Sequence, residues 1–139
     1  MPKISYWESE QDCKESAEEL ANQIPLGSSL ALIGGLGAGK TTFVRYLVRA
    51  LKIDTPVSSP TFVLQHEYLS ENVLVDHWDL YRLTGLPDEL WENPGNNVYR
   101  LVEWADKFPE FLDTCDFILK IDLIKKGLKL IREVHFLQK

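Results

Sequence analysis

The sequence predicts an α/β fold with a mixed sheet, whose core is parallel and whose C-terminal strands form an antiparallel hairpin. Three observations support this class. A glycine-rich segment stands between a short apolar run and an amphipathic segment, which is typical of a buried parallel strand that turns into a helix. Segments with strand patterns predominate after residue 60. Two alternating segments flank Lys-Lys-Gly at 125–127, as in a hairpin.

The first expected helix follows Ser9. Asp12 lies three residues after this serine, in a variant of the capping box. Pro25 and Gly27 end the helix, because neither residue suits a helix interior. The apolar face consists of Cys13, Ala17, Leu20, Ala21 and Ile24.

The glycine-rich segment Gly34–Thr41 reads GGLGAGKT and matches G-x-x-x-x-G-K-[ST]. The apolar run Ser29–Ile33 precedes it and has the composition of a strand buried on both faces. Helical spacing begins after Gly39, where the apolar residues lie on one face. They are Phe43, Val44, Leu47, Val48 and Leu51. The segment is therefore expected to connect a strand to a helix.

The remaining pattern predicts mostly strands and turns. In order, the expected elements are a proline-stiffened loop at 55–60, a strand at 61–68, a strand at 73–77, a short helix at 84–91 capped at Thr84, a turn at 94–97, a strand at 98–102 that ends at Glu103, and hairpin strands at 117–124 and 128–136.

The chemistry of the glycine-rich segment points to phosphate. Glycines allow successive N–H groups to point at phosphate oxygens, which a Cβ would obstruct. Lys40 can then reach the terminal phosphates, and the Thr41 hydroxyl can bind Mg²⁺. The N-terminus of the following helix adds its dipole to the anion site. The sequence therefore predicts a site for a nucleoside triphosphate.

Such a site also needs a carboxylate for the metal, usually at the end of a neighbouring strand. Two candidates fit. Asp76 follows three apolar residues, and Glu103 follows Arg100-Leu-Val. The pattern alone favours Asp76 slightly. The stretch His77-Trp-Asp-Leu-Tyr-Arg82 then brings an imidazole, a carboxylate, a phenol and a guanidinium into six residues, which marks it as a second candidate part of the site.

Composition bounds the protein class. The 139 residues are 45% hydrophobic, which suits a single domain over residues 1–139. No apolar run approaches the roughly 20 residues of a membrane span, and residues 1–11 lack the apolar region of a signal peptide. Cys13 and Cys115 are far apart and are expected to be reduced packing residues of a cytoplasmic protein. The net charge of −6 argues against tight independent binding to bare nucleic acid.

Four motifs in this order resemble the TsaE family, also called YjeE, small bacterial P-loop ATPases of tRNA threonylcarbamoyladenosine (t6A) modification. They are GGLGAGKTTF at 34–43, SPTF at 59–62, HWDLYRL at 77–83 and VEW at 102–104. The resemblance extends from about Ser9 to the final hairpin. It implies a three-layer α/β/α domain of the P-loop NTPase type that binds ATP and Mg²⁺. It also implies TsaD-like and TsaB-like protein partners, with tRNA contacted only through their complex.

The resemblance assigns roles to individual residues. It implies that Thr41 and Glu103 bind the metal, with Trp104 beside the site, and that Asp76 is only a strand-end residue. Asp79 receives a catalytic or metal-linked role. The three implied catalytic residues are Asp79, Thr61 and Lys40. Thr61 belongs to a switch-like loop near the γ-phosphate. The implied nucleotide-binding residues are Gly37, Ala38, Gly39, Lys40, Thr41, Thr42, Trp104, Glu10 and Lys129.

The chain departs from the family pattern at a few positions. Gly35 stands where the family usually has Asp, within the variable part of the loop, so the phosphate site is expected to be retained. The family often has Arg directly after the hairpin glycine, whereas this chain has Leu128 and then Lys129. Residues 86–97 form a short segment that does not follow the family pattern. These departures concern the contacts to the nucleobase and the partner surface.

Three functions compete. The first is an ATPase whose hydrolysis is stimulated by partners and regulates the TsaD–TsaB transferase. The second is a small-molecule kinase, but kinases generally need an acceptor pocket and a mobile, Arg-rich lid. Arg82 and Arg100 are isolated in the sequence, and no lid segment is evident. The third is a GTPase switch, for which the guanine-reading Asn-Lys-x-Asp sequence is absent.

Overall fold

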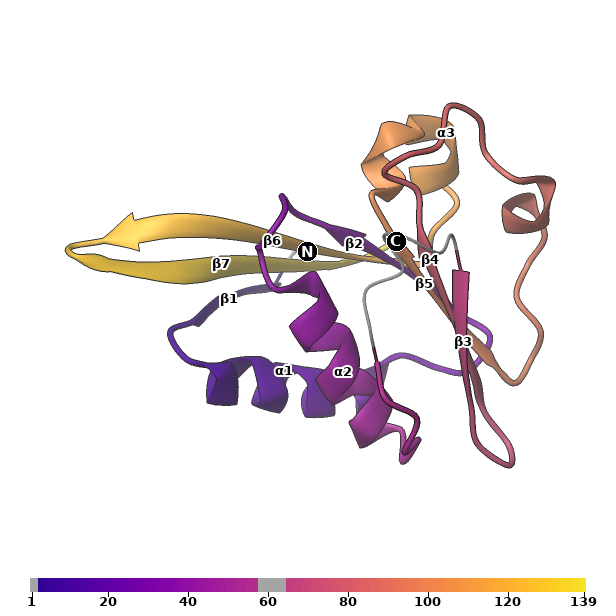
Figure 1. The fold of residues 1–139 in the computed structure, drawn as a ribbon, viewed down its shortest axis with the longest axis horizontal. Helices are drawn as coiled ribbons and strands as arrows, with labels where there is room; N and C mark the ends of the chain where they lie inside the picture. The colour runs from indigo at the N-terminus through magenta and orange to yellow at the C-terminus, as the bar shows by residue number, and fades with distance from the viewer. Residues whose placement is uncertain (1–2, 58–64) are drawn as a thin grey trace.

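The fold is built on one seven-stranded sheet. The structure is a computed structural model that describes residues 3–57 and 65–139. The strands are β1 (Lys3–Trp7), β2 (Ser29–Ile33), β3 (Gln65–Leu69), β4 (Leu74–Asp79), β5 (Val98–Glu103), β6 (Phe117–Lys126) and β7 (Lys129–Gln138). Their order across the sheet is β1-β7-β6-β2-β5-β4-β3. Figure 1 shows β6 and β7 extending well beyond the helices.

The centre of the sheet is parallel and both edges are antiparallel. Strand β2 pairs in parallel with β5 and β6, and β4 pairs in parallel with β5. Strand β3 lies antiparallel to β4 at one edge. At the other edge, β7 lies antiparallel to β6 and to β1. The predicted mixed sheet with a parallel core and a C-terminal antiparallel hairpin is therefore confirmed.

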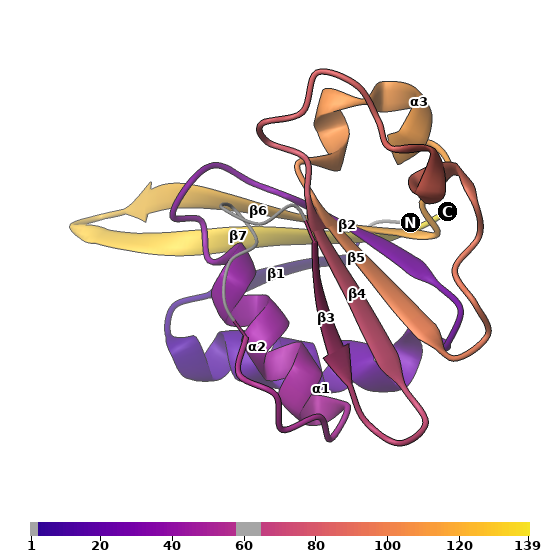
Figure 2. The ribbon, with the colours of Figure 1, turned by 45° about the vertical axis from the view of Figure 1, so that its right-hand side comes forward.

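Helices cover both faces of the sheet, so the fold has three layers. Helices α1 (Glu10–Gln23) and α2 (Lys40–Ala50) lie on one face, and α3 (Pro109–Leu112) lies on the other (Figures 1 and 2). Two short 3-10 helices, η1 (Asp88–Trp91) and η2 (Ala105–Lys107), contribute buried residues to the α3 side. Each layer of helices packs its own cluster of buried apolar side chains against the sheet. The three-layer α/β/α prediction is confirmed.

The first helix begins where its cap predicts. Ser9 is the N-cap, and its hydroxyl accepts a hydrogen bond from the backbone N–H of Asp12. The Asp12 carboxylate accepts from the N–H of Glu8, one residue before the position of an ordinary capping box. The helix buries Cys13, Ala17 and Leu20, which belong to the predicted apolar face.

Several elements were not predicted correctly. Strand β1 was missed, because a five-residue strand at the sheet edge depends on pairing with β7, more than 120 positions along the chain. The helix expected from Thr84 is instead the 3-10 helix at Asp88–Trp91, which follows Pro87. Helices η2 and α3 were also not predicted from the sequence. The hairpin turn is shorter than expected, with Gly127 and Leu128 between the two strands.

The segments around the middle of the chain differ in their bounds. Strand β4 continues to Asp79, two residues beyond the expected end at His77. Strand β3 is described from Gln65, and residues 61–64 of the expected strand lie outside the described residues. In residues 3–57 and 65–139, no helix is long and apolar enough to cross a membrane.

Candidate functional site

The glycine-rich loop joins β2 to α2 at the carboxyl end of the parallel strands. Gly34 needs to lack a side chain, since a Cβ there would approach the Ile121 carbonyl oxygen to 2.7 Å. Gly39 is the N-cap of α2 and has a φ of 109°, a conformation that L side chains rarely adopt. A Cβ on Gly35 would meet nothing within 4 Å, so this loop position tolerates the variation noted above.

Lys40 is the first residue of α2 and is only 6% exposed. Its Nζ donates to the Gly34 carbonyl oxygen at 2.5 Å and lies 4.1 Å from the ring centroid of Trp104. Burial lowers the pKa of this amine, while the nearby carboxylates of Glu103 and Asp79 act in the opposite direction. The lysine therefore stands between the loop and two acidic side chains.

Those two carboxylates come from the ends of neighbouring strands. Asp79 ends β4 and Glu103 ends β5, and the two residues are paired in the sheet register. Both are buried, at 6% and 3% exposure. The Asp79 carboxylate accepts a hydrogen bond from the N–H of Tyr81 at 2.8 Å, two residues on, which holds its side chain against the turn that follows β4.

A cavity of about 260 Å³ brings the predicted phosphate and metal residues together. Its lining comes from the glycine-rich loop, from the start of α2 and from the carboxyl ends of β4 and β5, where ligands bind in open parallel sheets. The lining residues are Leu36, Gly37, Ala38, Gly39, Lys40, Thr41, Thr42, Asp79, Glu103, Trp104 and Arg132.

Glu103 is held by a buried histidine. His77 Nε2 lies 2.6 Å from Glu103 Oε2, and the imidazole is fully buried. The other ring nitrogen, Nδ1, lies 3.2 Å from the hydroxyl of Tyr68 on β3. This chain of contacts crosses β5, β4 and β3, and it orients the carboxylate from the side away from the loop. Carboxylates that bind metals are usually themselves hydrogen-bonded, so this contact is compatible with the metal role predicted for Glu103.

Asp76 lies on the opposite face of the sheet from this site. Successive side chains of a strand alternate between faces, so Asp76 shares its face with Trp78 of the α3-side cluster, while His77 and Asp79 share the other. Its carboxylate accepts from Arg100 Nε at 3.1 Å and from Gln65 Nε2. The expectation that Asp76 ends its strand is wrong, since β4 continues to Asp79 and Asp76 forms a buried ion pair within it.

Trp104 lines the first cavity beside Lys40. It directly follows Glu103 and has a φ of 61°, which is uncommon for a residue other than glycine. The backbone N–H of Trp104 donates to the Leu32 carbonyl oxygen of β2 at 3.3 Å. The centroids of the Trp104 and Tyr81 rings lie 4.7 Å apart. The indole is thus fixed beside Lys40 by the loops that follow β4 and β5.

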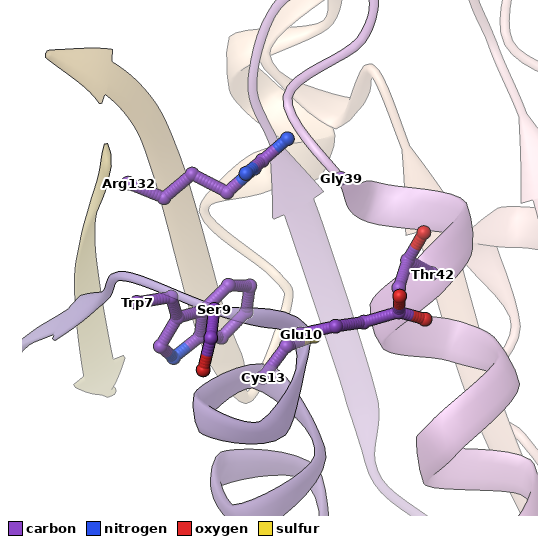
Figure 3. Close-up of a pocket in the computed structure, with 7 residues that line it drawn as sticks. All are labelled: Trp7, Ser9, Glu10, Cys13, Gly39, Thr42 and Arg132. Carbon is purple, nitrogen blue, oxygen red and sulfur yellow. The ribbon is translucent and has the colours of Figure 1, made fainter. Parts of the chain in front are cut away.

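A second cavity, of about 290 Å³, adjoins the first one. In Figure 3, Trp7 and Ser9 lie to the left and Thr42 to the right, Glu10 reaches across toward Thr42, and Arg132 extends above them toward Gly39. Cys13 completes the lining. Three residues line both cavities, namely Gly39, Thr42 and Arg132. The two hollows therefore meet at the N-terminus of α2.

The side chains of the second cavity are fixed by contacts with α1 and α2. Trp7 stacks on Phe43 with ring centroids 5.8 Å apart, and its Nε1 donates to Ser16 Oγ at 2.8 Å. Glu10 reaches across to α2 in Figure 3, where Oε1 accepts from Tyr46 Oη at 2.8 Å and from Arg45 at 3.0 Å. The cavity thus has an aromatic wall and an acidic wall.

The structure brings together most of the predicted site residues. Glu10 lines the second cavity, and the loop residues, Asp79, Glu103 and Trp104 line the first. Lys129 is exposed at the start of β7, lies outside both linings, and stays a prediction as a nucleotide contact. Thr61 lies outside the described residues.

Ser9, Cys13 and Leu36 line a cavity and belong to correctly predicted local elements, but they were not predicted as site residues. Two further lining residues, Trp7 and Arg132, were missed altogether. Both lie at the edge of the sheet, where Trp7 of β1 is paired with Arg132 of β7. Neither belongs to a recognisable motif. The only available signal was the period-2 pattern of residues 3–7, which would have placed Trp7 on a strand leading into α1.

A parallel strand that turns through this glycine-rich loop into a helix, within three α/β/α layers, defines a P-loop-type domain. The particular family follows from comparison with known proteins. The model of the family described as "Threonylcarbamoyl adenosine biosynthesis protein TsaE" matches residues 7–133, and the chain belongs to this family.

Individual relatives agree with this assignment. The chain is 39% identical over 128 residues to the tRNA threonylcarbamoyladenosine biosynthesis protein TsaE of Aquifex aeolicus, covering 90% of each chain. The protein of the same name from Synechocystis is 38% identical over 100 residues, or 67% of this chain and 64% of the relative. A crystal structure of Bacillus YdiB superposes with a TM-score of 0.72 at 33% identity, covering 98% of this chain and 86% of that one.

Proposed function

We propose that the protein is a Mg²⁺-dependent ATPase that supports t6A modification of tRNA in the cytoplasm. The observation that carries the proposal is the first cavity, where a glycine-rich loop and Lys40 face the paired carboxylates Asp79 and Glu103. Membership of the TsaE family supplies the pathway, since the name of the Aquifex relative assigns that protein to tRNA threonylcarbamoyladenosine biosynthesis. The cavity supplies the chemistry.

The residues of the cavity suit a triphosphate. Loop N–H groups and the dipole of α2 attract phosphate oxygens. Lys40 would exchange its bond to the Gly34 carbonyl oxygen for the terminal phosphates, a movement that its flexible stem allows. The second cavity would hold the nucleobase beside Trp7 and Glu10, because it adjoins the first one at the start of α2.

The donor set also fits magnesium. Mg²⁺ prefers oxygen ligands and binds through one or two carboxylates together with substrate phosphates. Thr41 and Glu103 would hold the ion, which would neutralise charge on the phosphates. His77 Nε2 contacts Oε2 of Glu103, and so it would keep this carboxylate aimed toward the loop. In residues 3–57 and 65–139, no three His, Cys, Asp or Glu side chains form a metal cluster by themselves.

Asp79 would position the attacking water. Its carboxylate lies at the end of β4, next to Glu103 in register, and is fixed by the N–H of Tyr81. A water held there could attack the γ-phosphate, which is the role of water-positioning residues in P-loop hydrolases. Thr61 is proposed as the residue that senses the γ-phosphate. Lys40 would stabilise the charge that develops on the transferred group.

We further propose that hydrolysis is slow in the isolated protein and regulates a transferase complex of TsaD-like and TsaB-like proteins. ATP binding and hydrolysis would control the assembly of this complex or reset it between cycles, and tRNA would be contacted only through it. An incompletely ordered site would be completed by the partner. Supplying a missing catalytic group in trans can raise hydrolysis by about 10³–10⁵.

The test is single-turnover hydrolysis at saturating ATP and Mg²⁺, with the protein alone and with its TsaD-like and TsaB-like partners. The expected result is slow release of phosphate that accelerates when both partners are present. Removing Mg²⁺ with an excess of EDTA should abolish the accelerated rate of hydrolysis. Fast hydrolysis by the lone protein would contradict partner activation, and phosphate transfer to a small-molecule acceptor would identify a kinase instead.

A further inference from the structure

Arg132 approaches the glycine-rich loop from the hairpin. It lies on β7, directly across from Trp7 of β1 and Leu123 of β6. Its Nε donates to the Ala38 carbonyl oxygen at 2.6 Å, and a Cβ built on Gly39 would lie 3.0 Å from the same nitrogen. The guanidinium is therefore in direct contact with the loop, although 94 positions separate the two residues that share the hydrogen bond.

The position of Arg132 is the junction of the two cavities. Gly39, Thr42 and Arg132 line both of them. A nucleotide with its terminal phosphates on the loop and its base beside Trp7 has to cross this junction. The parts of the molecule that lie between the base and the β-phosphate are the ribose and the α-phosphate. Of the described residues that line the second cavity, Arg132 is the only basic one.

We propose that Arg132 binds the α-phosphate of the nucleotide, an inference that rests on the function proposed above. The bond to Ala38 uses Nε, and a guanidinium has four further N–H donors arranged in a fork that suits phosphate oxygens. Figure 3 shows the side chain extending from its strand toward Gly39. Arg132 thus ties the bound nucleotide to β7, whereas Lys40 serves the terminal phosphates.

The separate roles of Arg132 and Lys40 predict different losses of affinity across adenosine, AMP, ADP and ATP. Arg132→Gln keeps a long side chain with an N–H donor for the Ala38 carbonyl oxygen but removes the charge. The substitution should lower the affinities for AMP, ADP and ATP by a similar factor, about tenfold to a hundredfold, and leave the affinity for adenosine unchanged. Lys40→Ala should lower the affinities for ATP and ADP much more than the affinity for AMP. Lys126→Gln removes a charge from the same hairpin, outside both cavities, and is the matched control.

The experiment measures the displacement of a fluorescent ADP analogue by each of the four ligands, for the wild type and the three variants. Circular dichroism and thermal unfolding check that each variant is folded. A second measurement compares ATP with both diastereomers of its α-thiophosphate analogue. Sulfur at the contacted position should weaken binding to the wild type, and that difference should disappear in Arg132→Gln.

Two results would overturn the inference while leaving the proposed function intact. One is equal ATP affinity of the wild type and Arg132→Gln. The other is a loss confined to ADP and ATP, which would mean that Arg132 acts on the terminal phosphates or only supports the loop through Ala38. Failure of the wild type to bind any of the four ligands would instead contradict the nucleotide site itself.

Discussion

Asp76 and Glu103 end otherwise similar apolar runs, and the structure predicts opposite consequences for their amide substitutions. Asp76→Asn should destabilise the fold and retain most of the hydrolysis, because Asp76 pairs with Arg100 on the face of the sheet away from the loop. Glu103→Gln should lose Mg²⁺-dependent hydrolysis, because Glu103 lines the first cavity, where we propose that the phosphates and the metal bind. Each substitution preserves shape and removes one charge.

The loss of folding stability expected for Asp76→Asn follows from the contacts of the Asp76 carboxylate. The Asp76 side chain is 8% exposed, and its two oxygens accept from Arg100 and from Gln65. Removing one partner of a buried ion pair costs about 3–5 kcal/mol. Asparagine retains one acceptor oxygen, so we expect about 2–4 kcal/mol. With an unfolding entropy of about 2 cal/mol/K for each of the 139 residues, this corresponds to a fall in Tm of roughly 7–14 °C.

The assay combines thermal unfolding with partner-stimulated ATP hydrolysis, measured at least 15 °C below the lowest Tm, a margin of about the expected shift. Glu67→Gln is the matched control, because Glu67 is paired with Asp76 in the sheet register but is exposed, and it should change stability by about 0.5 kcal/mol at most. The reasoning is refuted if Asp76→Asn unfolds at the wild-type temperature while its hydrolysis is lost. That result would make Asp76 the metal carboxylate after all.

Three further predictions concern single side chains. Lys40→Ala should weaken ATP about tenfold to a hundredfold without unfolding the protein, and equal affinities in a titration with a fluorescent ATP analogue would contradict its role at the phosphates. Asp79→Ala should bind ATP normally but lose the partner-stimulated rate in single-turnover assays, and a retained rate would remove Asp79 from the hydrolysis machinery. Burial raises the pKa of Cys13 to about 12 and that of Cys115 to about 11. At pH 8 only about one in ten thousand of the Cys13 thiols would be ionised, so mass spectrometry should find both unmodified by iodoacetamide until the protein is denatured.

The elements that position the site could be predicted because each depends on residues that lie close together in the sequence. The loop at 34–41 has a fixed spacing, and Ser9 caps its helix through a bond to a residue three positions away. The parallel core followed from an apolar strand that continues into an amphipathic helix. Resemblance to the TsaE family then selected Glu103, which lines the first cavity, whereas the residue pattern alone slightly favoured Asp76, which pairs with Arg100 on the opposite face of the sheet.

What only the tertiary structure decided depends on pairing between distant segments. The registers of β4 and β5 place Asp79 beside Glu103 at the site and Asp76 beside Arg100 on the other face, and a shift of one residue would reverse those faces. Strand β1 exists because β7 supplies its hydrogen-bonding partner, and that pairing alone brings Trp7 and Arg132 to the same cavity. Sequence therefore determined the glycine-rich loop, whereas long-range strand pairing determined which side chains surround it.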